Sequence, residues 1–402
     1  MQSKDKPDSN SDSLSDSAKT NETISPQMVT ADSVQSGKVP VVHSGMQQTV
    51  SELQPKISTY SVATTRSAIQ PLPLVEQPLE SERGLGEWLS IWWEGIRPAY
   101  LGLSLLPTLL GSVAAWTQSI SPKTPRGNFH PTRFVITLIA VLLLQISAHL
   151  INDYYDYLRG IDTNNSLGPG GLIQQGLIKP VRVLALGLIG LGLGTLLGAF
   201  VAVTGGWLVI AFGLMGVLAA YFYSGISKGL SSLALGELAC FFIFGPLLTI
   251  GSYMVQTGHL DRIVYIYSIS LGLLATVFIH LNNMRDTVSD ASAGKLTLAS
   301  LLGLWLSRTL YTILALGAYL PVVALAWPSH APHLLLLVLW ALPALVIAVT
   351  TVLRTDNPAS LHLAMYQTLR LETFFTILLI VALVVTAIFS ILPHLPSIAL
   401  PF

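Results

Sequence analysis

The chain has 402 residues, of which 51% are hydrophobic and only 10% are charged, and its formal net charge is zero. Soluble globular domains carry roughly 25% charged residues, so this composition excludes an ordinary soluble domain and indicates an integral membrane protein. A balanced charge also provides no basic surface for nucleic acid. The single cysteine, Cys240, excludes an internal disulfide and is interpreted as a small core residue.

The N-terminal segment differs in kind from the rest of the chain. It is rich in Ser, Thr, Gln, Asp and Pro and has little apolar periodicity. Such a segment buries too little apolar surface to offset the entropy lost on ordering, so we expect residues 1–82 to form a disordered polar tail. Residues 83–97 are then predicted to be an interfacial amphipathic helix. Their apolar side includes Trp88, Trp92 and Trp93, and indole rings favour the membrane interface.

Apolar runs of membrane-spanning length follow. A bilayer core requires roughly 20 predominantly apolar residues in a helix, and about nine runs meet that length, which predicts an all-α integral membrane fold. The predicted spans are residues 98–117, 133–152, 182–203, 206–223, 232–254, 262–283, 308–327, 333–353 and 371–392. They form a transmembrane domain of residues 98–392, followed by a short C-terminal tail of residues 393–402.

The distribution of Lys and Arg orients these spans, because positive residues gather on the cytoplasmic side. With the N-terminus in the cytoplasm, eleven positive residues near the membrane lie inside and four lie outside. The inside set is Arg83, Arg97, Arg159, Lys179, Arg182, Lys228, Arg285, Lys295, Arg308, Arg354 and Arg370, and the outside set is Lys123, Arg126, Arg133 and Arg262. We therefore expect a cytoplasmic N-terminus.

Two polar stretches at the ends of the second and sixth predicted spans share this cytoplasmic side. Asn152 and Asp156 are four residues apart, and Asn282, Asp286 and Asp290 repeat that spacing. If each helix continues, each set lies on one helix face. Carboxylates at the end of a membrane helix are energetically costly, so their presence indicates a structural or functional role. One such cluster is compatible with a cap that meets water, but two with the same spacing on the same side indicate a shared site.

The residue types in these stretches suggest a metal and a phosphorylated ligand. Neighbouring carboxylates repel one another, and Mg²⁺ relieves that repulsion while binding substrate phosphate oxygens. Basic residues beside the acids can contact the remaining phosphate oxygens. These are Arg159, Lys228, Arg285 and Lys295. A carboxylate–Mg²⁺–diphosphate bridge therefore accounts for both signs of charge.

An allylic diphosphate would allow a specific reaction at such a site. Its departure leaves a carbocation that an electron-rich aromatic ring can attack, provided that water is excluded. The nearby Tyr154, Tyr155, Tyr221 and Tyr223 can stabilise a cation through their ring faces or can simply be residues of the membrane interface.

The two stretches also carry a resemblance. The stretch from Asn152 to Asp162 resembles the first Asp-rich motif of the UbiA superfamily of membrane prenyltransferases, and the stretch from Asn282 to Leu298 resembles the second. The N-N-x-R-D…D…G-K-x-T-L form of the second is most similar to the 1,4-dihydroxy-2-naphthoate polyprenyltransferase branch of the menaquinone pathway. Weaker agreement comes from Arg97-Pro98, Gly168-Pro169 and Leu235-Gly236-Glu237.

The resemblance implies helices around a central cavity and an Mg²⁺-dependent transfer of a polyprenyl group to an aromatic ring carbon. In the dihydroxynaphthoate branch the ring carboxylate is lost at that carbon, which gives demethylmenaquinone. The implied catalytic and metal-binding residues are Asn152, Asp156, Asp286 and Asp290, with Asp153 and Asp162 as further metal candidates. The implied diphosphate-binding residues are Arg159, Lys228, Arg285 and Lys295. The implied partners are a polyprenyl diphosphate, an aromatic acceptor and the lipid bilayer, with no nucleic acid and no protein partner.

Alternatives stay open at this point. Gly170 and Gly171 stand where many relatives have basic residues, and Tyr223 and Lys228 are five residues apart rather than three. Both departures bear on the acceptor, for which homogentisate, 4-hydroxybenzoate, a chlorophyll precursor and a haem are the alternatives. An ion-coupled transporter is a further class, but transporters place acidic groups near the membrane midplane. We expect an enzyme in a bacterial cell membrane with its active site on the cytoplasmic side.

Three further polar residues have open roles. His149 and His280 precede the two motifs and are interpreted as helix-packing residues in preference to a metal ligand or base. Glu237 opens the fifth predicted span, where it can cap the helix, orient Lys228 or bind the acceptor.

Overall fold

A computed structural model describes residues 83–122, 128–160, 171–223, 229–327 and 332–392. Over these ranges the chain is helical, with one isolated β-bridge between Leu233 and Leu296. The predicted tails, residues 1–82 and 393–402, lie outside the described residues, so their disorder stays a prediction.

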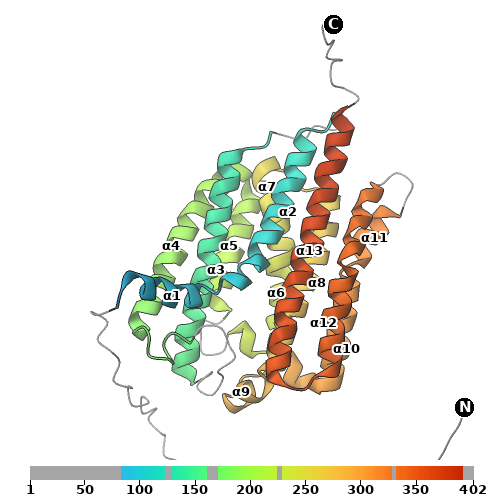
Figure 1. Cartoon of the computed structure of the whole chain (residues 1–402). Coiled ribbons are helices and arrows are strands. Elements are labelled where there is room, and N and C mark those ends of the chain that lie inside the picture. The colour runs from blue at the N-terminus through green and yellow to red at the C-terminus, as the bar shows by residue number, and fades with distance from the viewer. Residues whose placement is uncertain (1–82, 123–127, 161–170, 224–228, 328–331, 393–402) are drawn as a thin grey trace, which may run out of the picture. The chain divides into compact units, whose positions relative to one another are not determined.

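The described part begins with a broken helix. Helix α1 (Leu85–Ile96) is followed by Arg97, a 3₁₀ turn η2 (Pro98–Tyr100) and helix α2 (Gly102–Ser119). The two halves meet at a bend of 53°. Proline lacks a backbone N–H and disfavours the helical conformation in the residue before it, so Arg97-Pro98 ends α1. Helix α1 lies across the direction of the bundle helices in Figure 1, as an interfacial helix would.

The remaining helices run mostly along one direction (Figure 1). They are α3 (Pro131–Arg159), α4 (Pro180–Gly205), α5 (Trp207–Phe222), η3 (Leu230–Ser232), α6 (Gly236–Phe242), the π-helical η4 (Ile243–Leu247), α7 (Leu248–Thr257), α8 (Arg262–Arg285), α9 (Thr287–Ser292), α10 (Leu298–Gly317), α11 (Leu320–Ala326), the 3₁₀ helix η5 (His333–Ala341), α12 (Leu342–Arg354) and α13 (Pro358–Ile391).

The predicted all-α membrane fold is confirmed. In the part of the chain that is described, seven helical segments are long and apolar enough to cross a membrane, and the bent α1–α2 pair makes an eighth. Helix α5 corresponds to the remaining predicted span but has only 16 residues. A span count of nine and a cytoplasmic N-terminus therefore stay predictions.

The difference from the predicted boundaries that bears on the site concerns the first motif. Helix α3 runs to Arg159, whereas the predicted span ended at residue 152. The hydropathy falls at Asn152, but the helix continues for two turns and ends only at Gly160, whose φ of 68° lies in the left-handed region. The first motif is thus part of a helix and keeps one face turned toward its neighbours.

Close packing between α3 and α4 supports that motif from behind. A Cβ at Gly190 of α4 would come within 2.5 Å of Ser147 Oγ, and one at Gly194 within 3.0 Å of Leu144 Cγ. Only glycine therefore allows the two backbones to approach this closely. A small cluster that includes Ile91 of α1 and Leu150 of α3 holds α1 against the same helix.

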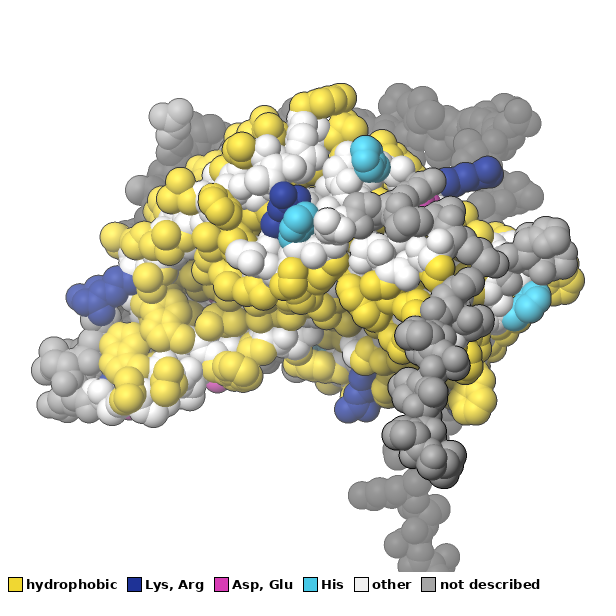
Figure 2. Space-filling model, turned by 90° about the horizontal axis from the view of Figure 1, so that it is seen from above, with side chains coloured by type: hydrophobic (Ala, Val, Ile, Leu, Met, Phe, Trp, Pro, Cys, Tyr) yellow, Lys and Arg dark blue, Asp and Glu magenta, His cyan; other side chains and the backbone are white. Residues whose placement is uncertain are grey.

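The surface of the bundle is apolar. Large hydrophobic side chains such as Phe200, Leu214 and Trp305 are exposed on helix surfaces. Figure 2, which views the bundle from the upper end of Figure 1, shows hydrophobic side chains predominating over the described surface. Because exposed apolar area of this extent is unfavourable in water, these helix faces are suited to lipid.

Candidate active site

One cavity brings the two motifs together. Helices α3, α8 and α9 end at the lower end of the bundle in Figure 1, so their C-terminal residues meet there. The cavity has a volume of about 240 Å³. The motif residues that line it are Asn152, Asp156, Asn282, Asn283, Arg285, Asp286, Asp290 and Lys295. Two stretches far apart in the sequence therefore face one space, as the predicted shared site requires.

The first motif is internally hydrogen-bonded. Asn152 Nδ2 donates to Asp156 Oδ2 at 2.6 Å, because the two residues are one helical turn apart on α3. Arg159 forms an ion pair with Asp156 Oδ1 at 3.2 Å. Arg159 also donates to the Tyr155 carbonyl and to Ser232 Oγ, and it does not line the cavity. Its guanidinium thus supports Asp156 from outside the cavity.

The second motif repeats this arrangement with direct charge pairs. Arg285 binds Asp286 through two hydrogen bonds, Nε to Oδ1 at 2.7 Å and Nη2 to Oδ2 at 2.5 Å. Its Nη2 also donates to Asn282 Oδ1 at 3.0 Å. Lys295 Nζ pairs with Asp290 Oδ1 at 3.1 Å. Each carboxylate that lines the cavity therefore has a cation of its own motif beside it.

The charge of Lys295 also interacts with the first motif. Burial lowers the pKa of its ammonium, but the carboxylates of Asp290, Asp156 and Asp286 act in the opposite direction and together raise the pKa above its usual value. Lys295 is consequently charged at neutral pH. The influence of Asp156, which comes from α3, shows that the charges of the two motifs act on one another across the cavity.

One predicted metal candidate lies outside the cavity lining, and two predicted site residues fall outside the described part of the chain. Asp153 is buried but does not line the cavity, and its carboxylate forms an ion pair with Arg97. Asp162 and Lys228 lie outside the described residues. The side chain of Asp153 points away because it follows Asn152 by about 100° around the helix. Its position makes it a support for Arg97 and not a ligand in the cavity.

Arg97 is a site residue to which the motif pattern gave little weight. It lines the cavity, and its φ of 55° and ψ of 61° place it in the left-handed region, which non-glycine residues rarely occupy. Strained backbone of this kind is found disproportionately at functional sites. Because its partner Asp153 is 56 residues away, no local spacing reveals the pair. The available signal was Arg97-Pro98, which marks the helix break.

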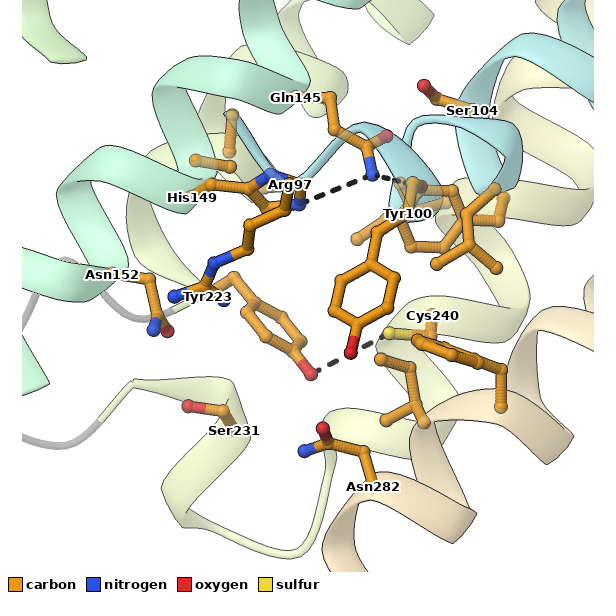
Figure 3. Close-up of a pocket in the computed structure, with 18 of the residues that line it drawn as sticks. Arg97, Tyr100, Ser104, Gln145, His149, Asn152, Tyr223, Ser231, Cys240 and Asn282 are labelled. Atoms are coloured by element: carbon orange, nitrogen blue, oxygen red, sulfur yellow. Dashed lines mark hydrogen bonds between the residues drawn. The ribbon is translucent and has the colours of Figure 1, made fainter. Parts of the chain in front are cut away.

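The aromatic wall differs from the one expected. Of the four tyrosines considered, only Tyr223 lines the cavity, with its hydroxyl 3.7 Å from Cys240 Sγ (Figure 3). The hydroxyls of Tyr155 and Tyr221 lie 3.4 Å apart outside the cavity lining. The other aromatic lining residues are Tyr100, Phe244 and Phe278.

The fifth predicted span contributes through an irregular turn. Its α6 and α7 segments are joined by the π-helical turn η4, which contains Pro246. Proline cannot donate the regular helix hydrogen bond, and π turns often occur at functional sites. Ile243, Phe244 and Leu247 of this turn line the cavity. The turn therefore supplies part of its apolar wall.

Glu237 supports the second motif from behind. It is buried outside the cavity lining, and its Oε1 accepts hydrogen bonds from Asn283 Nδ2 at 2.9 Å and His280 Nδ1 at 3.1 Å. The other His280 nitrogen faces the Ser307 carbonyl at 3.2 Å. Glu237 thus fixes α8 side chains beside Asn282, and His280 is held among protein acceptors.

The donor set suits a hard cation. Among the described residues, no three His, Cys, Asp or Glu side chains converge closely enough to hold a metal on their own. Mg²⁺ does not need such a cluster, since it keeps several water or phosphate ligands and uses one or two carboxylates. Asp156, Asp286 and Asp290 present carboxylates to the same cavity, and Asn152 and Asn282 add amides. The residues present therefore fit an Mg²⁺ ion that arrives with a phosphorylated ligand.

The fold and the cavity define a multi-pass membrane protein whose polar site, at one end of the bundle, can receive a metal-bound anion with an apolar portion. The sequence profile of the UbiA prenyltransferase family matches residues 104–376. The chain therefore belongs to the UbiA prenyltransferase family and is a prenyltransferase. This confirms the resemblance inferred from the two Asp-rich motifs.

Individual relatives agree with this assignment. The chain is 31% identical over 296 residues to a 1,4-dihydroxy-2-naphthoate octaprenyltransferase of Bacillus subtilis, which covers 74% of this chain and 93% of that protein. It is 29% identical over 314 residues to the Haemophilus influenzae protein of the same name, and the match covers 76% of this chain and 100% of that protein. It is also 32% identical over 298 residues to a Drosophila melanogaster UbiA prenyltransferase domain-containing protein 1 homolog, covering 71% and 77%.

Solved structures confirm the fold. An apo UbiA homolog from Aeropyrum pernix superposes with a TM-score of 0.54 at 14% identity, covering 70% of this chain and 97% of that chain. A UbiA homolog from Archaeoglobus fulgidus bound to GPP and Mg²⁺ gives a TM-score of 0.50 at 14% identity, covering 72% and 99%.

Proposed function

We propose that this protein transfers a polyprenyl group from an allylic diphosphate to 1,4-dihydroxy-2-naphthoate in an Mg²⁺-dependent reaction whose direct product is demethylmenaquinol, the reduced form of demethylmenaquinone. The observation that carries the proposal is the single cavity lined by both Asn-x-x-x-Asp stretches together with Arg285 and Lys295. The names of the Bacillus subtilis and Haemophilus influenzae relatives support this acceptor, and the magnesium-bound homolog from Archaeoglobus fulgidus supports the metal.

The proposed metal ligands are the cavity-lining oxygen donors Asn152, Asp156, Asp286 and Asp290. Bound Mg²⁺ would act as a Lewis acid that stabilises the departing diphosphate. Arg285 and Lys295 would donate to the diphosphate oxygens that the metal leaves free, since both residues line the cavity. Their present carboxylate partners hold them in place before the substrate arrives.

The proposed reaction balances as follows. The bond between the allylic carbon and the diphosphate oxygen breaks, and its electron pair leaves with the diphosphate. A ring carbon of the acceptor supplies the electron pair of the new carbon–carbon bond. The carboxylate on that carbon departs as CO₂, and its bonding pair restores the aromatic ring. Leu103, Phe244 and Phe278 provide apolar walls that keep water from the cation.

We also propose that the cavity opens to the cytoplasm of a bacterial cell. This proposal rests on the distribution of positive residues, because Arg159, Arg285 and Lys295 belong to the segments that carry the excess. Reactivity of single cysteines introduced near residue 292, measured in intact cells and in inverted vesicles, would test it. Labelling from outside intact cells with an impermeant reagent would contradict it.

The test of function is a turnover assay with purified protein in lipid nanodiscs. Farnesyl or longer diphosphate, Mg²⁺ and 1,4-dihydroxy-2-naphthoate should give pyrophosphate and a prenylated naphthoquinol, detected by mass spectrometry. Asp156→Ala should lower turnover by about 100-fold or more, because it removes a ligand of the Mg²⁺ that would stabilise the departing diphosphate. Asp356→Ala is the matched control, since Asp356 is 76% exposed and pairs with Arg308 away from the cavity lining.

Two results would overturn the proposal. Full turnover in EDTA would exclude the metal, and wild-type turnover of Asp156→Ala would exclude the first motif from the site. Parallel reactions with homogentisate and 4-hydroxybenzoate test the acceptor. A higher kcat/KM with either of these would replace dihydroxynaphthoate while leaving the reaction class intact.

A further inference from the structure

Helix α3 carries a second group of polar residues deeper in the same cavity. Gln145 and His149 share the cavity-facing side of the helix with Asn152 and Asp156. Gln145 precedes Asn152 by seven residues, or about 10 Å along the helix axis. It is only 8% exposed, so its amide needs hydrogen-bond partners in the protein or in a ligand. Figure 3 shows this amide between the His149 ring and the backbone at Tyr100.

The hydrogen bonds of this group account for all of its donors. Gln145 Nε2 lies 3.0 Å from the Tyr100 carbonyl and 3.4 Å from His149 Nε2. His149 Nδ1 lies 3.0 Å from the Ile96 carbonyl. A carbonyl only accepts, so His149 carries its proton on Nδ1, and its Nε2 accepts from Gln145. Both N–H groups of the Gln145 amide are thereby used.

The same contacts fix which way the amide points. If the oxygen and nitrogen of Gln145 exchanged places, the oxygen would face the Tyr100 carbonyl, and two acceptors would meet without a proton between them. The orientation with Nε2 toward Tyr100 is therefore the one that the network supports. It leaves Gln145 Oε1 buried with no hydrogen-bond partner among the described residues.

The unpaired oxygen Gln145 Oε1 can bind only some of the ligands of the proposed reaction. The inference rests on that proposed reaction. A diphosphate, a prenyl chain and a carboxylate offer no proton to an amide oxygen, whereas a ring hydroxyl does. We propose that Gln145 Oε1 accepts a hydrogen bond from a hydroxyl group of the aromatic acceptor and so determines both the position of the ring and the requirement for a hydroxylated substrate. The chain supplies every other bond of the amide, and the acceptor hydroxyl completes the set.

The bond would also assist the reaction. A hydroxyl that donates to an amide oxygen places more electron density on its own oxygen and hence on the ring, which favours attack on a carbocation. With the diphosphate held near Asn152 and Asp156, a ring anchored at Gln145 lies in the same cavity, about 10 Å along α3 from Asn152. A methyl ether at the same ring position would leave the buried oxygen without a donor and would be rejected.

The inference is tested by combining a variant that lacks the amide with ligands that lack one hydroxyl. Gln145→Met retains the length of the side chain but removes the amide. The ligands are 1,4-dihydroxy-2-naphthoate and its two analogues that each lack one hydroxyl, compared through inhibition constants or KM in nanodiscs. Losing a buried partner should weaken binding of the ligands that keep the relevant hydroxyl by about 10- to 100-fold. The analogue that lacks it should bind wild type and variant equally, and KM for the prenyl diphosphate should not change.

Gln118→Met is the matched control. Gln118 is a glutamine of α2 outside the cavity lining, and its amide is satisfied by Asp261 and Tyr253. This variant should leave the ratio between the ligands at its wild-type value.

Three outcomes would overturn the inference. An equal loss for every ligand with Gln145→Met would mean that the residue only holds the Tyr100 backbone. No loss for any ligand would mean that water satisfies the oxygen. If wild type prenylates dihydroxynaphthoate in either case, the proposed function stands while the inference fails. Absence of hydroxynaphthoate binding to wild type would overturn both.

Discussion

The Arg97–Asp153 ion pair makes a prediction that separates a supporting residue from a metal ligand. The side chains are 15% and 3% exposed, so both charges are largely removed from water. Replacing one member of a buried pair leaves the other charge uncompensated and typically costs about 3–5 kcal/mol, or roughly 150- to 5,000-fold in the folding equilibrium. Asp153→Leu should therefore lower the free energy of unfolding by about 3 kcal/mol.

The companion variants sharpen this expectation. Arg97→Met in the Asp153→Leu background removes the orphaned guanidinium, so the double variant should regain most of the lost stability. The double variant should nevertheless be inactive, because Arg97 lines the cavity and its charge is lost there. Thermal unfolding in detergent, followed by intrinsic fluorescence, gives the stabilities, and pyrophosphate release gives the activities.

The concentration of Mg²⁺ that gives half-maximal turnover provides the deciding readout. It should be unchanged in any residual activity of Asp153→Leu, because Asp153 does not line the cavity. It should rise in Asp286→Asn, whose carboxylate does. The reasoning would be refuted by an equal rise in both variants, or by a double variant no more stable than Asp153→Leu alone.

Two further predictions concern stability. Glu372 on α13 is 1% exposed, and neither carboxylate oxygen has a hydrogen-bond partner in the part of the chain that is described, so Glu372→Met should raise the melting temperature in detergent; a lower one would reveal a compensating partner. Gly190→Ala should destabilise the protein through its contact with Ser147, whereas Gly192→Ala, which meets open space, should be neutral or stabilising by up to about 1 kcal/mol. Equal melting temperatures for the two glycine variants would contradict the α3–α4 packing.

The sequence was most informative where function depends on local spacing. The four-residue interval between Asn152 and Asp156 survives folding directly, because it is one helical turn and α3 continues through it. The same holds for Asp286 and Asp290 only in part, since α8 ends at Arg285 and α9 begins anew at Thr287. Both carboxylates nevertheless reach the cavity.

What could not be predicted depends on contacts between distant helices. Asp153 is adjacent to Asn152 in the sequence, but its role follows from Arg97, which is held at a helix break in another part of the chain. Gln145 resembles any polar residue within an apolar run until the Tyr100 carbonyl and His149 are seen beside it. Hydropathy placed the end of the second span at residue 152 but did not show that helix α3 continues to Arg159, because apolar length registers polarity and not helix continuity.

The charge pairs within each motif have a consequence for how the cavity meets its ligands. Among the described residues that line it, three carboxylates face three permanent cations. The carboxylates are those of Asp156, Asp286 and Asp290, and the cations are Arg97, Arg285 and Lys295. Asp156 and Arg97 have their own partners, Arg159 and Asp153, outside the lining. An electroneutral vestibule gives little long-range attraction to a bare divalent cation or to a bare pyrophosphate, since either would have to separate pairs that already neutralise each other. A metal chelate of the diphosphate carries positive and negative charge together. Its metal can replace the cation beside a carboxylate, and its diphosphate can replace the carboxylate beside a cation. Such double exchange favours joint entry of metal and substrate, and it favours their joint departure as a metal–pyrophosphate complex after turnover.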